Sequence, residues 1–172
     1  MLAGLSSSSW ATSFPMVRAG GMFIFIMGAS VALGAVLPNR RRLLLVVGAA
    51  AATIAIILLA ARLSAPFGIP TRIQFGFLFA SIGAEAILVR AAVALYRAAG
   101  ERSLLLAVLL AVGLHFLPMA VAFGPMCALL GLTLCGSAGI GLWLRTDVPL
   151  NRFWASDGLI KMAFGSIMFL TA

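Results

Sequence analysis

Five ionisable side chains lie within apolar stretches of the sequence, and they are the residues from which chemistry is most expected. They are Glu85, Arg90, His115, Asp157 and Lys161. An ionisable side chain is costly in the hydrocarbon core of a bilayer, so it usually faces a bundle interior or a water-filled cavity. Carboxylate, imidazole and ammonium groups in such a place suit the binding of a proton, an ion or a small polar solute.

Glu85 is the strongest of the five candidates. It lies near the middle of the apolar stretch 73–96, about 15 Å or more from either end at the rise of a helix, which a glutamate side chain cannot span. Gln74 and Ser81 fall within about 40° of Glu85 on a helical wheel, so the three residues form a polar stripe. We interpret the stripe as part of a proton or cation site; the alternative is a structural hydrogen bond to a neighbouring helix.

His115 lies near the middle of another apolar stretch, 103–123, three residues before Pro118. The proline disrupts the helical hydrogen bond to the Leu114 carbonyl, so a kink is expected. A histidine beside a freed carbonyl suits the coordination of an ion or polar substrate. The alternative is a neutral core histidine with a hydrogen bond to another helix.

The remaining three candidates lie nearer one end of their stretches. Asp157 and Lys161 have the i, i+4 spacing of an intrahelical ion pair, which serves either structure alone or the gating of a cytoplasm-facing cavity. Arg90 points about 160° away from the polar stripe, so it is expected to reach the head groups or to pair with another helix. These depths together predict a polar cavity that is open to the cytoplasm and closed near the membrane midplane.

The composition identifies the solvent of these residues as lipid. Of 172 residues, 63% are hydrophobic and 9% are charged, against roughly 45–50% and 25% in soluble domains, and the mean hydropathy is +1.18. Apolar blocks of membrane-spanning length predict an all-α, polytopic protein with six transmembrane helices in one domain, 19–172, after an N-terminal tail, 1–18. The predicted helices are 19–37, 43–61, 73–96, 103–123, 126–144 and 153–171.

The arginines predict the orientation. The connections after the first, third and fifth predicted helices are rich in arginine, whereas the opposite side has only Arg18, Arg62 and Arg72. Because cytoplasmic loops carry the excess of basic residues, both termini are predicted on the non-cytoplasmic side. Trp143 and Trp154 flank the last cytoplasmic loop, as an aromatic belt does. The arginines of the first group are Arg40, Arg41, Arg42, Arg97, Arg102, Arg145 and Arg152.

The net charge of +8 does not indicate nucleic-acid binding, because no basic face has interleaved aromatic residues. Membrane lipids are the expected partners, with anionic head groups at Arg40, Arg41 and Arg42. No motif with metal-ligand spacing is present, and no cofactor is expected. Cys127 and Cys135 are eight residues apart in one predicted helix, too far for a mutual disulfide.

Small residues recur every four positions in two predicted helices, a pattern that permits close helix packing. The stripe in 126–144 consists of Cys127, Gly131, Cys135 and Gly139, and 19–37 contains Gly28 with Ala32 and Ser30 with Gly34. Packing within the chain is the favoured interpretation; the same stripes could instead serve homo-oligomerisation.

The two halves of the chain have similar arrangements of charge. An arginine, Arg62 or Arg145, ends the middle helix of each half, and the third helix then carries an acid followed by a base. Two three-helix repeats in this order would be inverted, which is an architecture frequent in transporters. Chance similarity between apolar helices is the alternative.

Short motifs in the last third of the chain resemble those of small bacterial membrane proteins of unknown function. They are His115-Phe116-Leu117-Pro118, then Gly124-Pro125, and Asp157-Gly158-Leu159-Ile160-Lys161. The resemblance implies a multi-pass protein of the bacterial inner membrane and implies no activity.

The favoured function is a small transporter or channel-like protein for a proton, an ion or a small polar solute. In this hypothesis Glu85 holds the proton or cation, His115 completes the site, and Asp157 and Lys161 gate its cytoplasmic mouth, with Ser81, Gln74 and Arg90 as further candidates. A non-catalytic membrane subunit or homo-oligomeric scaffold is the second hypothesis, and a membrane-embedded enzyme acting on a lipid is the third. Against an enzyme stand the lack of a nucleophile motif and of paired carboxylates.

Overall fold

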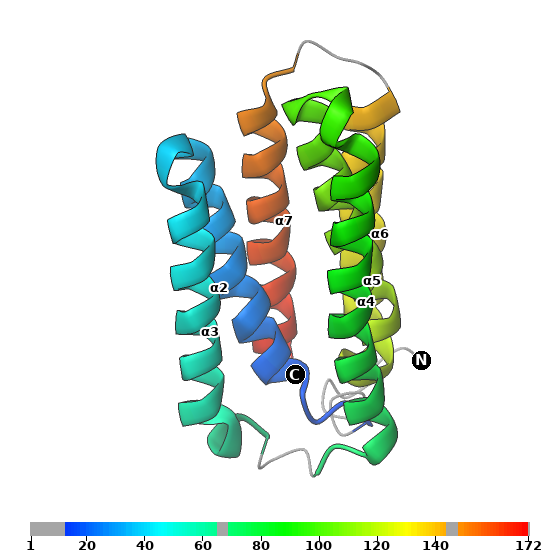
Figure 1. The fold of residues 1–172 in the computed structure, drawn as a ribbon. Helices are drawn as coiled ribbons and strands as arrows, with labels where there is room; N and C mark the ends of the chain where they lie inside the picture. Colours follow the sequence, from blue (N-terminus) through cyan, green and yellow to red (C-terminus); the bar gives the residue numbers. More distant parts are fainter. Residues whose placement is uncertain (1–12, 65–68, 144–147, 172) are drawn as a thin grey trace, which may run out of the picture.

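Six long helices make up the part of the chain that the structure describes, and they alternate in direction (Figure 1). The computed structural model describes residues 13–64, 69–143 and 148–171. Each of the six is long and apolar enough to cross a membrane, and the described residues contain no strand. The predicted all-α, six-helix fold is therefore confirmed. The helices are α2 (Val17–Val36), α3 (Arg41–Ser64), α4 (Arg72–Tyr96), α5 (Glu101–Phe123), α6 (Pro125–Trp143) and α7 (Leu150–Thr171).

The helix ends follow local sequence signals. Thr71 and Gln74 form a capping box at the start of α4. Gly124 has a φ of 88°, which suits glycine, and with Pro125 it separates α5 from α6. Short 3₁₀ turns, η1 (Pro38–Arg40) and η3 (Arg97–Ala99), follow α2 and α4. The observed bounds lie within about three residues of those predicted, which is the usual error at helix ends.

Two predictions concern residues that the structure does not describe or describes only in part. Most of the predicted tail, 1–18, lies outside the described residues, as does Arg145. Within the described part, Met16 and Val17 are buried and Phe14 packs against the core. The last part of the predicted tail therefore belongs to the helical bundle.

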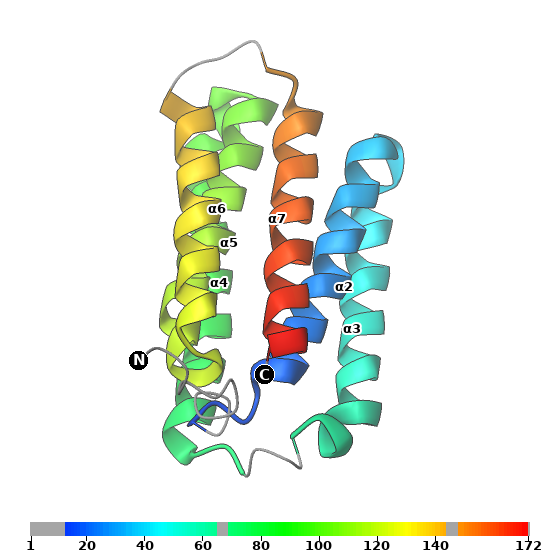
Figure 2. The same ribbon diagram turned by 180° about the vertical axis from the view of Figure 1, so that it is seen from behind.

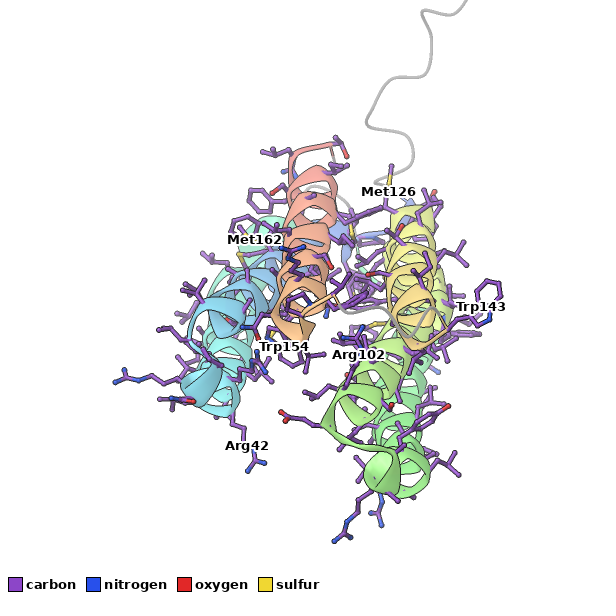
Figure 3. All side chains as sticks on the ribbon, turned by 90° about the horizontal axis from the view of Figure 1, so that it is seen from above. Arg42, Arg102, Met126, Trp143, Trp154 and Met162 are labelled. Atoms are coloured by element: carbon purple, nitrogen blue, oxygen red, sulfur yellow. The ribbon has the colours of Figure 1, made fainter. Side chains whose placement is uncertain are left out.

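The helices form two layers of three (Figures 1 and 2). In the first, which we call the α2 layer, α2 packs between α3 and α7; in the second, the α5 layer, α5 packs between α4 and α6. The backbones of the two layers come closest along α6 and α7, while α2 and α7 meet α5 through the buried side chains of the core. Seen from above, the layers diverge from this edge (Figure 3).

The packing order agrees with the one expected for two inverted three-helix units. The first helix of each unit, α2 or α5, packs against the second helix of its own unit and the third helix of the other. Corresponding helices also run in opposite directions (Figure 1). The contact between α6 and α7 has no counterpart of similar extent between α3 and α4 among the described residues.

Glycines allow α2 and α7 to approach closely. A Cβ atom added to Gly21, Gly28, Gly158 or Gly165 would lie between 2.5 and 2.8 Å from a backbone atom of the opposite helix. On α6, Gly131 packs against α5, whereas the space beside Gly139 is open. The predicted small-residue stripes are thus used largely for packing within the chain.

Candidate functional site

The structure brings Glu85 and His115 together from two neighbouring helices. The His115 Nε2 atom lies 3.7 Å from the Glu85 Oε2 atom. The His115 side chain is 8% exposed and the Glu85 side chain is 34% exposed. The glutamate therefore forms the accessible side of the pair and the histidine its buried side.

The imidazole of His115 is oriented by its own helix. Its Nδ1 atom lies 2.6 Å from the Val112 carbonyl oxygen, and its ring stacks at an angle on Phe116. The partner of Nδ1 is therefore a carbonyl of α5 itself rather than a group on another helix. Helix α5 continues through Pro118 to Phe123.

Asp157 and Lys161 form a buried ion pair on α7. The Lys161 Nζ atom donates a hydrogen bond to the Asp157 Oδ2 atom at 2.6 Å, and both side chains are buried. The i, i+4 spacing predicts this contact, and the structure confirms it. The pair lies on α7, which makes a limited contact with α5.

These four residues constitute what we call the buried polar cluster: Glu85 of α4, His115 of α5, and Asp157 and Lys161 of α7. Tyr96 ends α4 eleven residues after Glu85, and Lys161 lies eleven residues after Leu150, which begins α7. The backbones of Glu85 and Lys161 thus lie about 16 Å along their helices from the same end of the bundle. The cluster therefore lies well inside the membrane-spanning part of the protein.

The other members of the predicted polar stripe have partners of their own. Gln74 receives the Thr71 N–H on its side-chain oxygen and donates to the Ser13 carbonyl at 2.9 Å, about 16 Å from Glu85 along the helix. The Ser81 hydroxyl is buried and donates to the Phe77 carbonyl at 2.6 Å. Gln74 therefore lies apart from Glu85. Ser81 lies one turn from Glu85, but its hydroxyl hydrogen is already donated to the Phe77 carbonyl.

Arg90 is exposed on α4. The structure does not bring it into the buried polar cluster. This position agrees with its predicted orientation away from the stripe.

The end of the bundle at which α4 ends and α7 begins carries most of the arginines, and two of them hold the start of α7. Arg41 donates to the Gly34 carbonyl at 2.9 Å and to the Asn151 side chain, and its guanidinium lies over the Trp154 ring. Trp154 is consequently buried, which corrects its predicted place in an aromatic belt. Trp143, in contrast, is exposed.

Arg102 makes the corresponding contact from the α5 layer. It donates to the Val148 carbonyl at 2.5 Å, and its guanidinium lies over the Phe153 ring. Neither arginine contact with α7 is predictable from the sequence, because each joins residues far apart in the chain. Arg41 is therefore engaged within the protein, whereas Arg40 and Arg42 are exposed.

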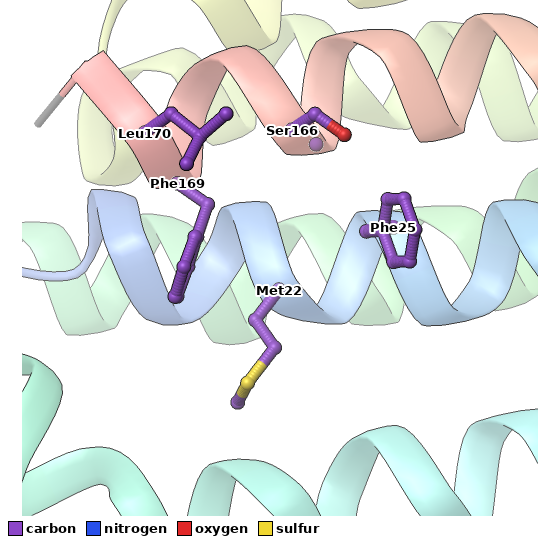
Figure 4. A pocket seen from close by; sticks show the side chains of 6 residues that line it. Met22, Phe25, Ser166, Phe169 and Leu170 are labelled. Atoms are coloured by element: carbon purple, nitrogen blue, oxygen red, sulfur yellow. The ribbon is translucent and has the colours of Figure 1, made fainter.

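Two pockets lie away from the cluster and are apolar. One, of about 260 Å³, is lined from α2 and α7 by Met22, Phe25, Phe169 and Leu170 among others (Figure 4). The other, of about 310 Å³, lies on α4 around Gly76. Among the described residues, no group of three or more histidine, cysteine or acidic side chains could hold a metal ion.

Six membrane-length helices with ionisable side chains buried between them define a polytopic helical membrane protein. The chain belongs to DUF6609, a family of unknown function, whose model matches residues 7–172. No curated protein and no solved structure matches the chain.

Proposed function

We propose that the protein is a small integral membrane transporter and that the buried polar cluster binds its cargo, which is a proton, an ion or a small polar solute. The observation that carries this proposal is the contact of 3.7 Å between Glu85 of α4 and His115 of α5 deep within the bundle. Ionisable groups at this depth are costly, and they commonly mark an ion pathway or proton relay.

The charge of the cluster favours a positively charged cargo. Asp157 and Lys161 neutralise each other, so Glu85 contributes one uncompensated negative charge when His115 is neutral. A single proton or monovalent cation would restore neutrality in a medium where an unpaired charge is expensive. The partial exposure of Glu85 supplies a side from which the cargo reaches the site.

The arrangement of the helices supports a transporter as well. Inverted repeats are common in secondary transporters, whose sites lie near the midplane between the repeats. The packing order of the two layers is compatible with such a repeat. We further propose that the arginine-rich end faces the cytoplasm of a bacterial cell, with exposed Arg40 and Arg42 contacting anionic head groups.

A second candidate function, a non-catalytic subunit or oligomeric scaffold, is favoured by the exposure of two helices. The buried share of the apolar segment in each span is 11% for α3 and 6% for α4, against 33–39% for the other four helices. A partner protein or a second copy could cover these faces. Native mass spectrometry after mild solubilisation tests this candidate, since a stable assembly supports it and a monomer contradicts it.

Electrophysiology on solid-supported membranes tests the transporter. Reconstituted wild-type protein is exposed to jumps of pH and to a panel of ions and small solutes. The matched variants are Glu85→Gln and Glu101→Gln, since Glu101 is an exposed acid at the start of α5. We expect a transient current in wild type and Glu101→Gln, and the signal of empty liposomes in Glu85→Gln.

A current that persists unchanged in Glu85→Gln contradicts the proposed site. The absence of current in wild type under every gradient contradicts transport itself. Circular dichroism and size-exclusion chromatography establish that each variant remains folded before the currents are compared.

A further inference from the structure

The hydrogen position on His115 follows from its contact with Val112. A carbonyl oxygen only accepts hydrogen bonds, so the 2.6 Å contact requires a hydrogen on Nδ1. A neutral imidazole carries one ring hydrogen, and its Nε2 atom is then an acceptor. Nε2 is also the atom that faces Glu85.

This orientation makes the contact between the two side chains dependent on a proton. An ionised carboxylate only accepts hydrogen bonds, so a neutral His115 would present one lone pair to another. A single added proton removes the conflict, whether it is on the imidazole or on the carboxyl group. The resulting pair has no net charge, whereas its loss leaves one negative charge within the membrane.

The choice of cargo depends on the space that each candidate needs. Asp157 and Lys161 are already in direct contact, and neither of the two pockets described above is lined by a residue of the cluster. A proton needs no preformed cavity, because it binds to a lone pair. Among the cargoes proposed above, the proton therefore fits the described arrangement best.

We infer that Glu85 and His115 together form a one-proton site and that the transported or coupled ion is the proton. This inference rests on the proposed function and specifies its cargo. In the loaded state the proton is bonded either to Glu85 Oε2 or to His115 Nε2. Its transfer breaks one O–H bond and forms one N–H bond, and no further reactant is required.

The separation of 3.7 Å between the two atoms is longer than a hydrogen bond of about 2.7–3.2 Å. Transfer therefore requires that α4 and α5 approach locally by roughly 1 Å, or that one water molecule bridges the atoms. Glu85 is the more exposed partner, so we assign to it the exchange of the proton with the surroundings of the pair. His115 is the buried acceptor behind it.

The other ionisable groups on the helices around His115 keep their charges in the proposed proton transfer. Lys161 and Asp157 on α7 are paired, α6 contributes the thiols Cys127 and Cys135, and α2 contributes Arg18 in its first turn. On α4 the remaining charged residue near the middle is the exposed Arg90. Glu85 is therefore the ionisable group whose neutralisation should most affect His115.

Solid-state NMR tests the site directly, because His115 is the only histidine in the chain. The full-length protein, purified through a tag without histidine, is labelled with ¹⁵N-histidine and reconstituted in lipid bilayers. In the neutral ring we expect the hydrogen on Nδ1, in contrast to free histidine, where Nε2–H prevails. Across a series of pH values, we expect the Nε2 resonance to report binding of one proton.

Two variants show whether Glu85 shares that proton. Glu85→Gln should change the titration of the Nε2 resonance, whereas Glu101→Gln should leave it as in wild type. If the neutral ring of the wild-type protein carries its hydrogen on Nε2, the wild-type spectrum alone overturns the inference. Identical titrations in wild type and Glu85→Gln would overturn it as well.

The outcomes separate this inference from the proposed function. A current carried by another ion, together with an unaltered titration in Glu85→Gln, contradicts the one-proton site and leaves transport standing. The expected tautomer and titration in a protein without any current support the proton site and contradict transport.

Discussion

At the scale of single residues, Asp157 and Lys161 show how burial changes the contribution of an ion pair to stability. An exposed i, i+4 pair contributes a few tenths of a kcal/mol, but here both groups are buried. The desolvation of two charges offsets much of their attraction. The pair is therefore expected to add little net stability as a whole, while the loss of either partner alone leaves an uncompensated charge.

Replacement of both residues by apolar ones tests this expectation. Asp157→Leu or Lys161→Met alone should lower the free energy of unfolding by about 3–5 kcal/mol, whereas the double variant should lie close to wild type. Unfolding titrations in mixed micelles measure the three values. A double variant that is less stable than either single one would show that the pair itself stabilises the fold.

The sequence predicts the members of the site better than it predicts their contacts. The depths of Glu85 and His115 follow from counting residues along each helix, so their common level could be anticipated. Their pairing could not, because it depends on which helices are neighbours. Gln74 was assigned to the stripe by its angle alone, although Thr71 three residues earlier gives the signature of a capping box.

At the scale of helices, glycine determines how closely α2 and α7 pack. A Cβ atom on Gly158 would lie 2.5 Å from the Ala32 backbone nitrogen, whereas the space beside Gly83 on α4 is open. The two positions are both within helices, so they differ in packing rather than in secondary structure. They form a matched pair for substitution.

Gly158→Ala should separate α2 from α7 and destabilise the protein by about 1–3 kcal/mol, the usual cost of overpacking. Gly83→Ala should be neutral or stabilising by up to about 1 kcal/mol, because alanine favours the helix. Thermal unfolding followed by circular dichroism compares the two variants with wild type. Equal loss in both would indicate that the close approach of α2 and α7 is not required.

Helix existence was predictable from apolar length, and helix order around the bundle was not. The six spans follow from blocks of about twenty apolar residues. In lipid, however, an exposed face is as apolar as a buried one, so periodicity does not tell which side of a helix packs. Small residues partly replace that signal, as Gly28 and Ala32 on the face of α2 toward α7 illustrate.

At the scale of the whole molecule, the arginine-rich end gives a test of orientation. Single cysteines at Ala99 and Ile69 would lie at opposite ends of α4, both at exposed positions. In a background of Cys127→Ala and Cys135→Ala, a membrane-impermeant maleimide applied to intact spheroplasts should label only Ile69→Cys, because positive-inside places Ala99 in the cytoplasm. Inside-out vesicles should give the opposite result, and the reverse pattern in both preparations would contradict the proposed topology.

The close approach of the two layers along one edge has a mechanical consequence. Rotation about α6 and α7 would disturb fewer backbone contacts than separation within either layer, although it would shift the core side chains that join the layers. It would also change the area that the protein occupies in the bilayer, so lateral tension would do work on it. Glu85 and His115 belong to one layer and Lys161 to the other. Such a rotation would leave the carboxylate and imidazole together while it moves the ammonium charge relative to them. If Glu85 and His115 bind the proposed proton, such a rotation would link their proton affinity to the tension of the surrounding membrane.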